Sequence, residues 1–279
     1  MPNWRLRPVF LGIAFSGAIV GHVAAEQPRE ADQTAREIIS KALERATENE
    51  EHNFSARYRS QMFKHVKRFD GQGNISEEDK GDYEVTPIDG VPFERRLTVG
   101  NRPLSDEEQL WEKERQTNFR EELQRLRTET GNNEEDEEAI RFNRELAERY
   151  VFTLEQEEIY RNRPTYRVSF RPRSDELPVR RRIDYALNKA RGTVWIDRET
   201  YEATRVEFEL IDKVRLWWGV LGTINHARGS IDRRPVLDDI WVQVQFETYT
   251  DSRAVFKRTR RSEFRQWQNF QWNKNENRH

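Results

Sequence analysis

The chain of 279 residues contains no cysteine. This absence excludes a disulfide scaffold, a zinc–thiolate site and a cysteine nucleophile. It also excludes a lipid-modified cysteine after an export signal. A fold built from this sequence must therefore rest on side-chain packing and backbone pairing alone.

Patterns that carry catalysis or bind metals are also scarce. None of the five histidines forms a close pair with another ligand at metal spacing. No glycine-rich phosphate loop precedes a helix, and no Gly-x-Ser-x-Gly motif occurs. Asp197 and Glu199 resemble paired carboxylates, but a hairpin turn favours their use in capping backbone amides. We therefore expect no enzyme activity, no metal and no cofactor.

An excess of either charge is missing as well, because 48 basic residues face 50 acidic ones. Proteins that bind nucleic acid usually carry a basic field, so we expect no such partner. Two basic clusters, 180–182 and 257–261, are still compatible with nucleic acid. For an exported protein, a solvated strand face or contact with anionic lipid headgroups is the more natural interpretation.

The first 25 residues have the order of a secretory signal peptide. Arg5 and Arg7 form a basic start, an apolar run spans 9–20, and small residues end at Ala25. The run is too short for a spanning helix, although an uncleaved anchor is the alternative. Cleavage after Ala25 changes the net charge from −2 to −4. We expect a periplasmic or secreted protein whose mature chain, 26–279, is one domain without a dividing linker.

Most segments after residue 54 alternate between apolar and polar residues, which is typical of half-buried strands. About ten strands follow one another mostly as hairpins, without a strand–helix–strand repeat, so we expect an antiparallel sheet. An amphipathic helix is predicted over 32–47. A charged helical insert is predicted over about 105–148, and its second helix begins at residue 134.

One hairpin, GTVWIDRETYEATRVEFEL, resembles that of the periplasmic outer-membrane lipoprotein-sorting carriers and their relatives. The long strand FSARYRSQM resembles the same carriers and relatives, as do the signal peptide and the amphipathic first helix. The stretch YEVTPIDGVPFERRL…GNRPLSDEEQ is similar to an uncharacterised secreted bacterial branch of that superfamily. The resemblance implies an α+β fold of mainly antiparallel strands, a strongly curved unclosed half-barrel covered by an N-terminal helix and the helical insert. The implied role is to hold an acyl chain or a hydrophobic segment of a partner. The insert is longer than a simple lid, and the basic triplet 180–182 has no counterpart in the family.

We therefore predict an exported, non-enzymatic protein that binds a hydrophobic ligand (a lipid, an acyl chain or a lipoprotein) in its concave face, with a role in envelope transport. The alternative is an interaction or sensor module that uses the charged insert and binds no lipid. The predicted hydrophobic lining consists of Phe54, Tyr58, Met62, Phe152, Val168, Phe170, Val206, Phe208, Val242, Val244 and Phe246.

A second predicted contact lies in the apolar stretch 214–224. Leu216, Trp217 and Trp218 either form a buried strand pair or a tongue at the barrel mouth. Tryptophan suits the second role, because its ring is apolar and its N–H favours a wet boundary. The tongue is expected to touch a lipid, an acylated protein or, transiently, a membrane surface.

Overall fold

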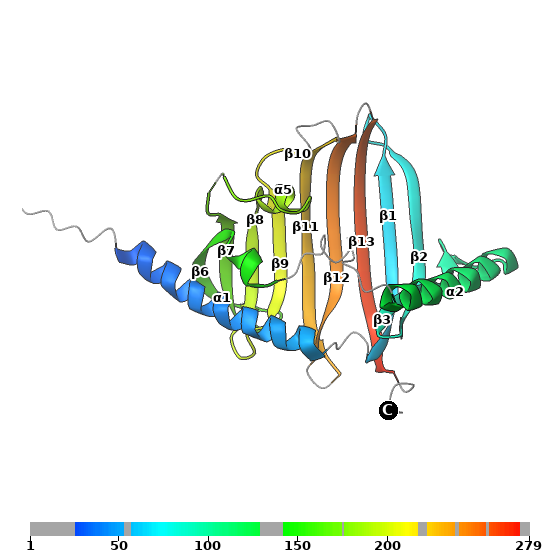
Figure 1. Cartoon of the computed structure of the whole chain (residues 1–279), viewed down its shortest axis with the longest axis horizontal. Helices are drawn as coiled ribbons and strands as arrows, with labels where there is room; N and C mark the ends of the chain where they lie inside the picture. The colour runs from blue at the N-terminus through cyan, green and yellow to red at the C-terminus, as the bar shows by residue number, and fades with distance from the viewer. Residues whose placement is uncertain are drawn as a thin grey trace, which may run out of the picture.

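The computed structural model describes residues 26–52, 57–128, 142–174, 176–216, 222–237, 240–254 and 257–273. Within these ranges the chain forms one large antiparallel sheet with helices against it (Figure 1). The order of strands in the sheet is β3-β2-β1-β13-β12-β11-β9-β8-β7-β6, with β10 paired to β11. The two ends of this order, β3 and β6, do not pair with each other, so the sheet is open. The predicted unclosed α+β half-barrel is confirmed.

The strands are long, and most neighbours in sequence are neighbours in the sheet. Their bounds are β1 Tyr58–Phe69, β2 Ile75–Ile88, β3 Val91–Arg96, β6 Tyr150–Tyr160, β7 Arg163–Pro172, β8 Ala190–Asp197, β9 Ala203–Leu210, β10 Val214–Leu216, β11 Gly222–Val236, β12 Ile240–Ala254 and β13 Lys257–Trp272. A separate small pair joins β4 (Thr98–Val99) to β5 (Arg102–Pro103).

The helices among the described residues are α1 (Glu26–His52), α2 (Asp106–Thr128), α4 (Arg144–Ala147) and α5 (Asp184–Leu187). In Figure 1, α1 runs across the sheet from β6 and β7, while α2 lies beside β3 at the opposite end. The α2 helix begins as predicted, with Glu108 accepting a hydrogen bond from the Ser105 backbone and Ser105 Oγ accepting one from the Glu108 backbone.

The predicted second helix of the insert is interrupted. Phe142 and Asn143 are not helical, and a single turn, α4, forms over Arg144–Ala147. The insert ends near residue 148 as predicted, and β6 begins at Tyr150, where the alternating pattern resumes and pairs with β7. The part of that helix predicted at 134–141 lies outside the described residues.

The turn between β8 and β9 is organised by Asp197, whose side chain is fully buried. Its carboxylate accepts hydrogen bonds from the backbone N–H groups of Glu199 and Thr200, at 3.0 and 2.9 Å. It also receives the Arg163 guanidinium, at 2.5 Å from Nε. The capping role predicted for Asp197 is confirmed, and it explains how a short polar segment holds two long strands in register.

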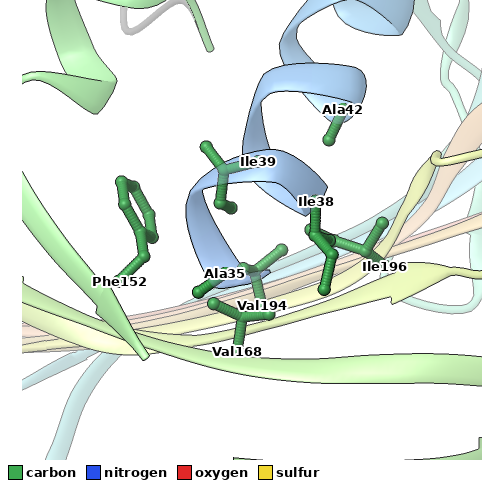
Figure 2. Packing of buried hydrophobic residues seen from close by; sticks show 8 residues of the cluster. All are labelled: Ala35, Ile38, Ile39, Ala42, Phe152, Val168, Val194 and Ile196. Carbon is green, nitrogen blue, oxygen red and sulfur yellow. The ribbon is translucent and has the colours of Figure 1, made fainter. Parts of the chain in front are cut away.

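A hydrophobic cluster joins α1 to one end of the sheet (Figure 2). One face of α1 presents small and branched residues at helical spacing, which pack against inward-facing residues of β6, β7 and β8. The buried members of this α1 cluster are Ala35, Ile38, Ile39, Ala42, Phe152, Val168, Val194 and Ile196. Burial of this apolar stripe, rather than helix propensity alone, explains why α1 is stable.

Candidate functional site

A row of apolar side chains crosses the sheet on the face that α1 covers. Cross-strand pairing places these residues directly opposite one another on adjacent strands, so their side chains share one face. We call this set the apolar row, and it consists of Leu154, Val168, Val194, Val206, Ile231 and Phe246.

Coverage changes along the apolar row. Val168 and Val194 lie under α1 and are 0% and 4% exposed. Leu154 at the β6 end is half-buried, and so are Val206, Ile231 and Phe246 on β9, β11 and β12. The fully buried strand residues of the α1 cluster lie on β6, β7 and β8, and Val206 packs against them. The row is therefore packed core at β7 and β8 and becomes more accessible from β9 to β12.

Two phenylalanine rings widen this apolar surface. Each ring lies against a glycine on the adjacent strand of the sheet. A Cβ added to Gly192 would lie 2.6 Å from Cζ of Phe170, and one added to Gly229 would lie 2.7 Å from Cζ of Phe208. Only glycine leaves room for these rings. Phe170 and Phe208 are both half-buried on the same face as the apolar row.

Beyond Phe246 the same face becomes charged. Phe246 pairs with Arg265, and Arg265 pairs with Lys64 on β1. Arg265 donates to Glu263 and Glu94, at 2.5 and 2.9 Å, and Lys64 lies 3.6 Å from Glu94. The charges compensate one another, so the apolar row ends at a polar boundary on β13.

Most described residues of the predicted lining are distributed over three clusters, and Phe208 and Phe246 belong to none of them. Phe152 and Val168 belong to the α1 cluster, and Phe170 and Val206 pack against it. Met62 lies in a second cluster on β1 and β2 and is 1% exposed. The third cluster contains Val242, Val244 and Tyr58, whose pKa is raised by burial.

Four predicted site residues lie at or beyond the limits of the described ranges. Phe54, Trp217 and Trp218 lie outside the described residues. Leu216 ends β10 and pairs with Gly222 of β11. Whether the stretch acts as a tongue stays a prediction.

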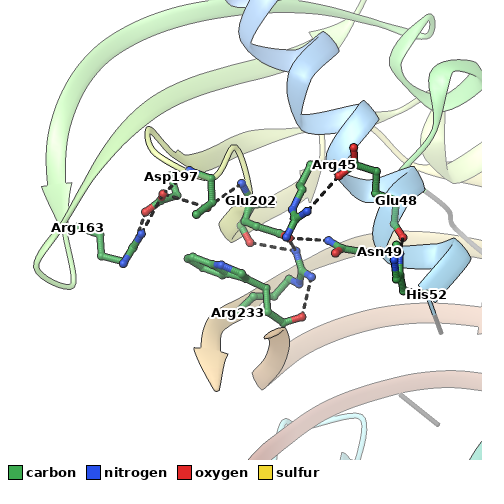
Figure 3. A network of polar contacts seen from close by, with 11 residues as sticks. Arg45, Glu48, Asn49, His52, Arg163, Asp197, Glu202 and Arg233 are labelled. Atoms are coloured by element: carbon green, nitrogen blue, oxygen red, sulfur yellow. Dashed lines mark hydrogen bonds and ion pairs between the residues drawn. The ribbon is translucent and has the colours of Figure 1, made fainter. Parts of the chain in front are cut away.

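A polar network holds α1 against the sheet (Figure 3). The alternating pattern of apolar and polar residues did not predict it. Its centre is Glu202, which is 2% exposed and follows the turn between β8 and β9. Its carboxylate receives Arg45 Nε at 3.1 Å, Asn49 Nδ2 at 2.5 Å and Arg233 Nη1 at 2.8 Å. The network joins the carboxyl half of α1 to β9 and β11, next to the half-buried part of the apolar row.

Burial and hydrogen bonding shift the pKa values of two titratable groups near the site. Burial raises the pKa of Tyr150 to about 12, and its hydroxyl donates to the Leu187 carbonyl at 2.8 Å. Burial also acts to raise the pKa of Asp197, but the hydrogen bonds from Arg163 and Thr200 outweigh it and hold that pKa below its ordinary value. Each group has a defined structural partner.

The described residues include no group of three or more His, Asp or Glu side chains arranged to hold a metal ion. Within the same ranges, no helix has the length and hydrophobicity required to cross a membrane. The described residues also line open cavities. A cavity of about 300 Å³ lies on the face opposite the apolar row, and one of about 340 Å³ lies between α5 and β10.

No protein-family model matches the chain, and no curated protein sequence matches it either. Solved structures do show similarity. A DUF1329 family protein from Desulfovibrio piger has a TM-score of 0.35 at 12% identity, over 85% of this chain and 94% of that one.

Two other similar structures come from the superfamily that the sequence resembles. One is a putative outer membrane lipoprotein-sorting protein domain from Vibrio parahaemolyticus, with a TM-score of 0.32 at 11% identity, covering 86% of this chain and 95% of that one. The other is a LolA superfamily protein from Nitrosomonas europaea, with a TM-score of 0.30 at 8% identity, covering 86% and 93%. Because these TM-scores are low, the functions of those proteins do not transfer to this chain.

Proposed function

We propose that this chain is an exported, non-enzymatic binding protein that holds a lipid, an acyl chain or an acylated protein against its apolar row. The observation that supports the proposal is the change in coverage along this row. Val206, Ile231 and Phe246 extend the apolar row from the buried part of the α1 cluster onto β9, β11 and β12 and are only half-buried. An acyl chain laid there would remove this apolar surface from water, at ~25 cal/mol per Å².

The export part of the proposal depends on the first 25 residues, and the mature chain would begin at Glu26. N-terminal sequencing of the periplasmic or secreted fraction tests it directly. An intact Met1 in that fraction would contradict cleavage.

Ligand binding is tested by extracting the purified protein with organic solvent and identifying co-purified lipid by mass spectrometry. The informative variant is Phe246→Ser, on the apolar row, and its matched control is Phe264→Ser. Both rings are half-buried on neighbouring strands, but Phe264 pairs with Glu247 and so lies on the opposite face. We expect lipid yield to fall in the first variant alone. Equal yields from both variants would contradict this location for the ligand.

A second candidate function is a protein-interaction module that uses α2. Leu110 and Trp111 on this helix are 65% and 60% exposed, which is unusual for large apolar side chains. In that case extraction would recover no lipid, and Leu110→Ser with Trp111→Ser would weaken capture of a protein partner by the intact chain.

A further inference from the structure

The cavity between α5 and β10 has a composition unlike the rest of the sheet. Its volume is about 340 Å³, and its lining consists of Tyr185, Lys189, Asp212, Lys213, Val214 and Arg215. Three of these side chains are cationic, and one is acidic. A water molecule occupies ~30 Å³ in the liquid, so the cavity has room for a group much larger than one water.

We call this the rim cavity. The two segments that line it, 185–189 and 212–215, are held in place by backbone hydrogen bonds. The Ile211 N–H donates to the Lys189 carbonyl at 2.8 Å. Val214 is 2% exposed and pairs with Ile224 of β11, which fixes the segment that carries Lys213 and Arg215. The cations therefore converge on one place because of the fold, although the two segments are separate in sequence.

Positive charge is in excess in the rim cavity, because three cations share the lining with one carboxylate. Within the described residues, Lys189, Lys213 and Arg215 form no ion pair at 4.0 Å or less, and Asp212 uses one oxygen to accept the Lys213 backbone N–H at 2.7 Å. Other basic residues of nearby strands are paired: Arg191 lies 2.7 Å from Glu209, for example.

The rim cavity also lies close to one end of the proposed ligand surface. Phe208 precedes Asp212 by four residues, which span at most ~13 Å, and the chain bends after Leu210. Tyr150 of β6, which packs against the α1 cluster, donates to the Leu187 carbonyl at the end of α5. An acyl chain on the half-buried apolar surface would thus have its polar end within reach of the cations.

We propose that the rim cavity binds a phosphate-type anion, the headgroup of an anionic lipid whose acyl chain lies on the apolar row. This inference rests on the proposed function for the acyl chain, whereas the anion site rests on the cavity and its charges. Guanidinium and ammonium groups form charge-assisted hydrogen bonds to phosphate oxygens. The Tyr185 hydroxyl is a further donor of the same lining.

The test compares three soluble probes by isothermal titration calorimetry: myristoyl lysophosphatidylglycerol, monomyristoylglycerol and glycerol 3-phosphate. The first carries the anion and the acyl chain, and each of the others carries one of them. The test variant is K189Q/K213Q/R215Q. The control is K113Q/R120Q/R234Q, which removes three exposed cations outside the cavity lining.

We expect the native chain to bind the anionic lysolipid about tenfold or more tightly than monomyristoylglycerol, since one charge-assisted bond is worth about that factor. The preference should weaken with added salt. The test variant should lose the preference and keep its affinity for monomyristoylglycerol, while the control variant keeps both.

The outcomes separate the two proposals. Binding of both acyl probes without a headgroup preference overturns the anion site and leaves the proposed function standing. Equal loss in the test and control variants also overturns the anion site, because net charge alone would then explain the preference. Binding of glycerol 3-phosphate alone, lost only in the test variant, supports a site for free phosphate compounds and contradicts the lipid source. A single K213Q variant provides the same comparison if the triple variant fails to fold.

Discussion

Replacing Glu202 with glutamine should destabilise the protein by about 2–3 kcal/mol, because three donors lose one buried carboxylate. The donors are Arg45, Asn49 and Arg233, at 3.1, 2.5 and 2.8 Å. Each hydrogen bond to a charged group contributes ~1.5–3 kcal/mol when well shielded. The two arginine side chains are 38% and 26% exposed, so solvent screening reduces the sum.

The assay is urea unfolding followed by circular dichroism, with Glu48→Gln as the matched control. Glu48 also pairs with Arg45, at 3.0 Å, but its side chain is 59% exposed. We expect the control to change the free energy of unfolding by less than ~1 kcal/mol. For a chain of this size each kcal/mol shifts Tm by ~2–4 °C, so Glu202→Gln should lower Tm by about 4–12 °C.

The loss of stability in Glu202→Gln should be largest where the network contacts α1. Hydrogen exchange should accelerate in the carboxyl half of α1, where Arg45 and Asn49 lie, more than around Ile38 in the α1 cluster. Equal stability of the two glutamine variants would refute the reasoning, because the buried network would then contribute no more than an exposed ion pair.

Three further predictions address the core, the sheet and the acid limit. Ile38→Ala should cost about 2–4 kcal/mol in urea unfolding, while Leu110→Ala, at a residue 65% exposed, should change stability little. Gly192→Ala should cost about 1–3 kcal/mol or more, because its Cβ would lie 1.9 Å from a β9 carbonyl oxygen, whereas Gly71→Ala meets no atom within 4 Å; equal melting temperatures would contradict this. Because the folded pKa of Asp197 is lowered, its contribution is complete above its unfolded pKa of ~3.9 and is lost as pH falls through the folded value. Asp197→Asn should therefore lower neutral-pH stability and flatten the acid side of the stability curve, and an unchanged slope would count against the pairing.

Strand alternation was sufficient to predict most of the architecture. On β9, the predicted lining residues Val206 and Phe208 lie on one face, and Val206 is opposite Val194 of β8. The alternation is broken near the turn: a register shift between Trp195 and Ile196 pairs Ile196 with Ala203, and the Thr204 hydroxyl donates to the Trp195 carbonyl. A β-bulge changes which side chains face the core, but the sequence still alternates between apolar and polar residues. The alternating pattern therefore does not predict where the bulge lies.

The candidate site was harder to predict, because it depends on register across distant strands. The alternating sequence of β12 places Val242, Val244 and Phe246 on one face, so all three are predicted to line the ligand surface. The register between β11 and β12 shifts at this point, because Asp232 pairs with Gln245 and Arg233 with Gln243, which leaves Val244 as an extra residue on β12. Val242 and Val244 join the third cluster, while Phe246 stays on the apolar row. The Glu202 network was invisible for a similar reason, since its donors lie 157, 153 and 31 residues away in sequence.

The charged insert acquires a structural role from its contacts with an edge strand. An open sheet exposes unpaired backbone groups at its edges, where other chains can add strands. At the β3 edge, Glu112 of α2 accepts the Arg96 N–H at 3.2 Å, and Arg115 donates to the Glu94 carbonyl. Side chains of α2 thus use the hydrogen-bonding groups that a neighbouring strand would otherwise take. The same helix turns Trp111 outward, at 60% exposure. One face of α2 therefore protects the half-barrel from edge-to-edge pairing, while the other is the surface that the interaction hypothesis requires.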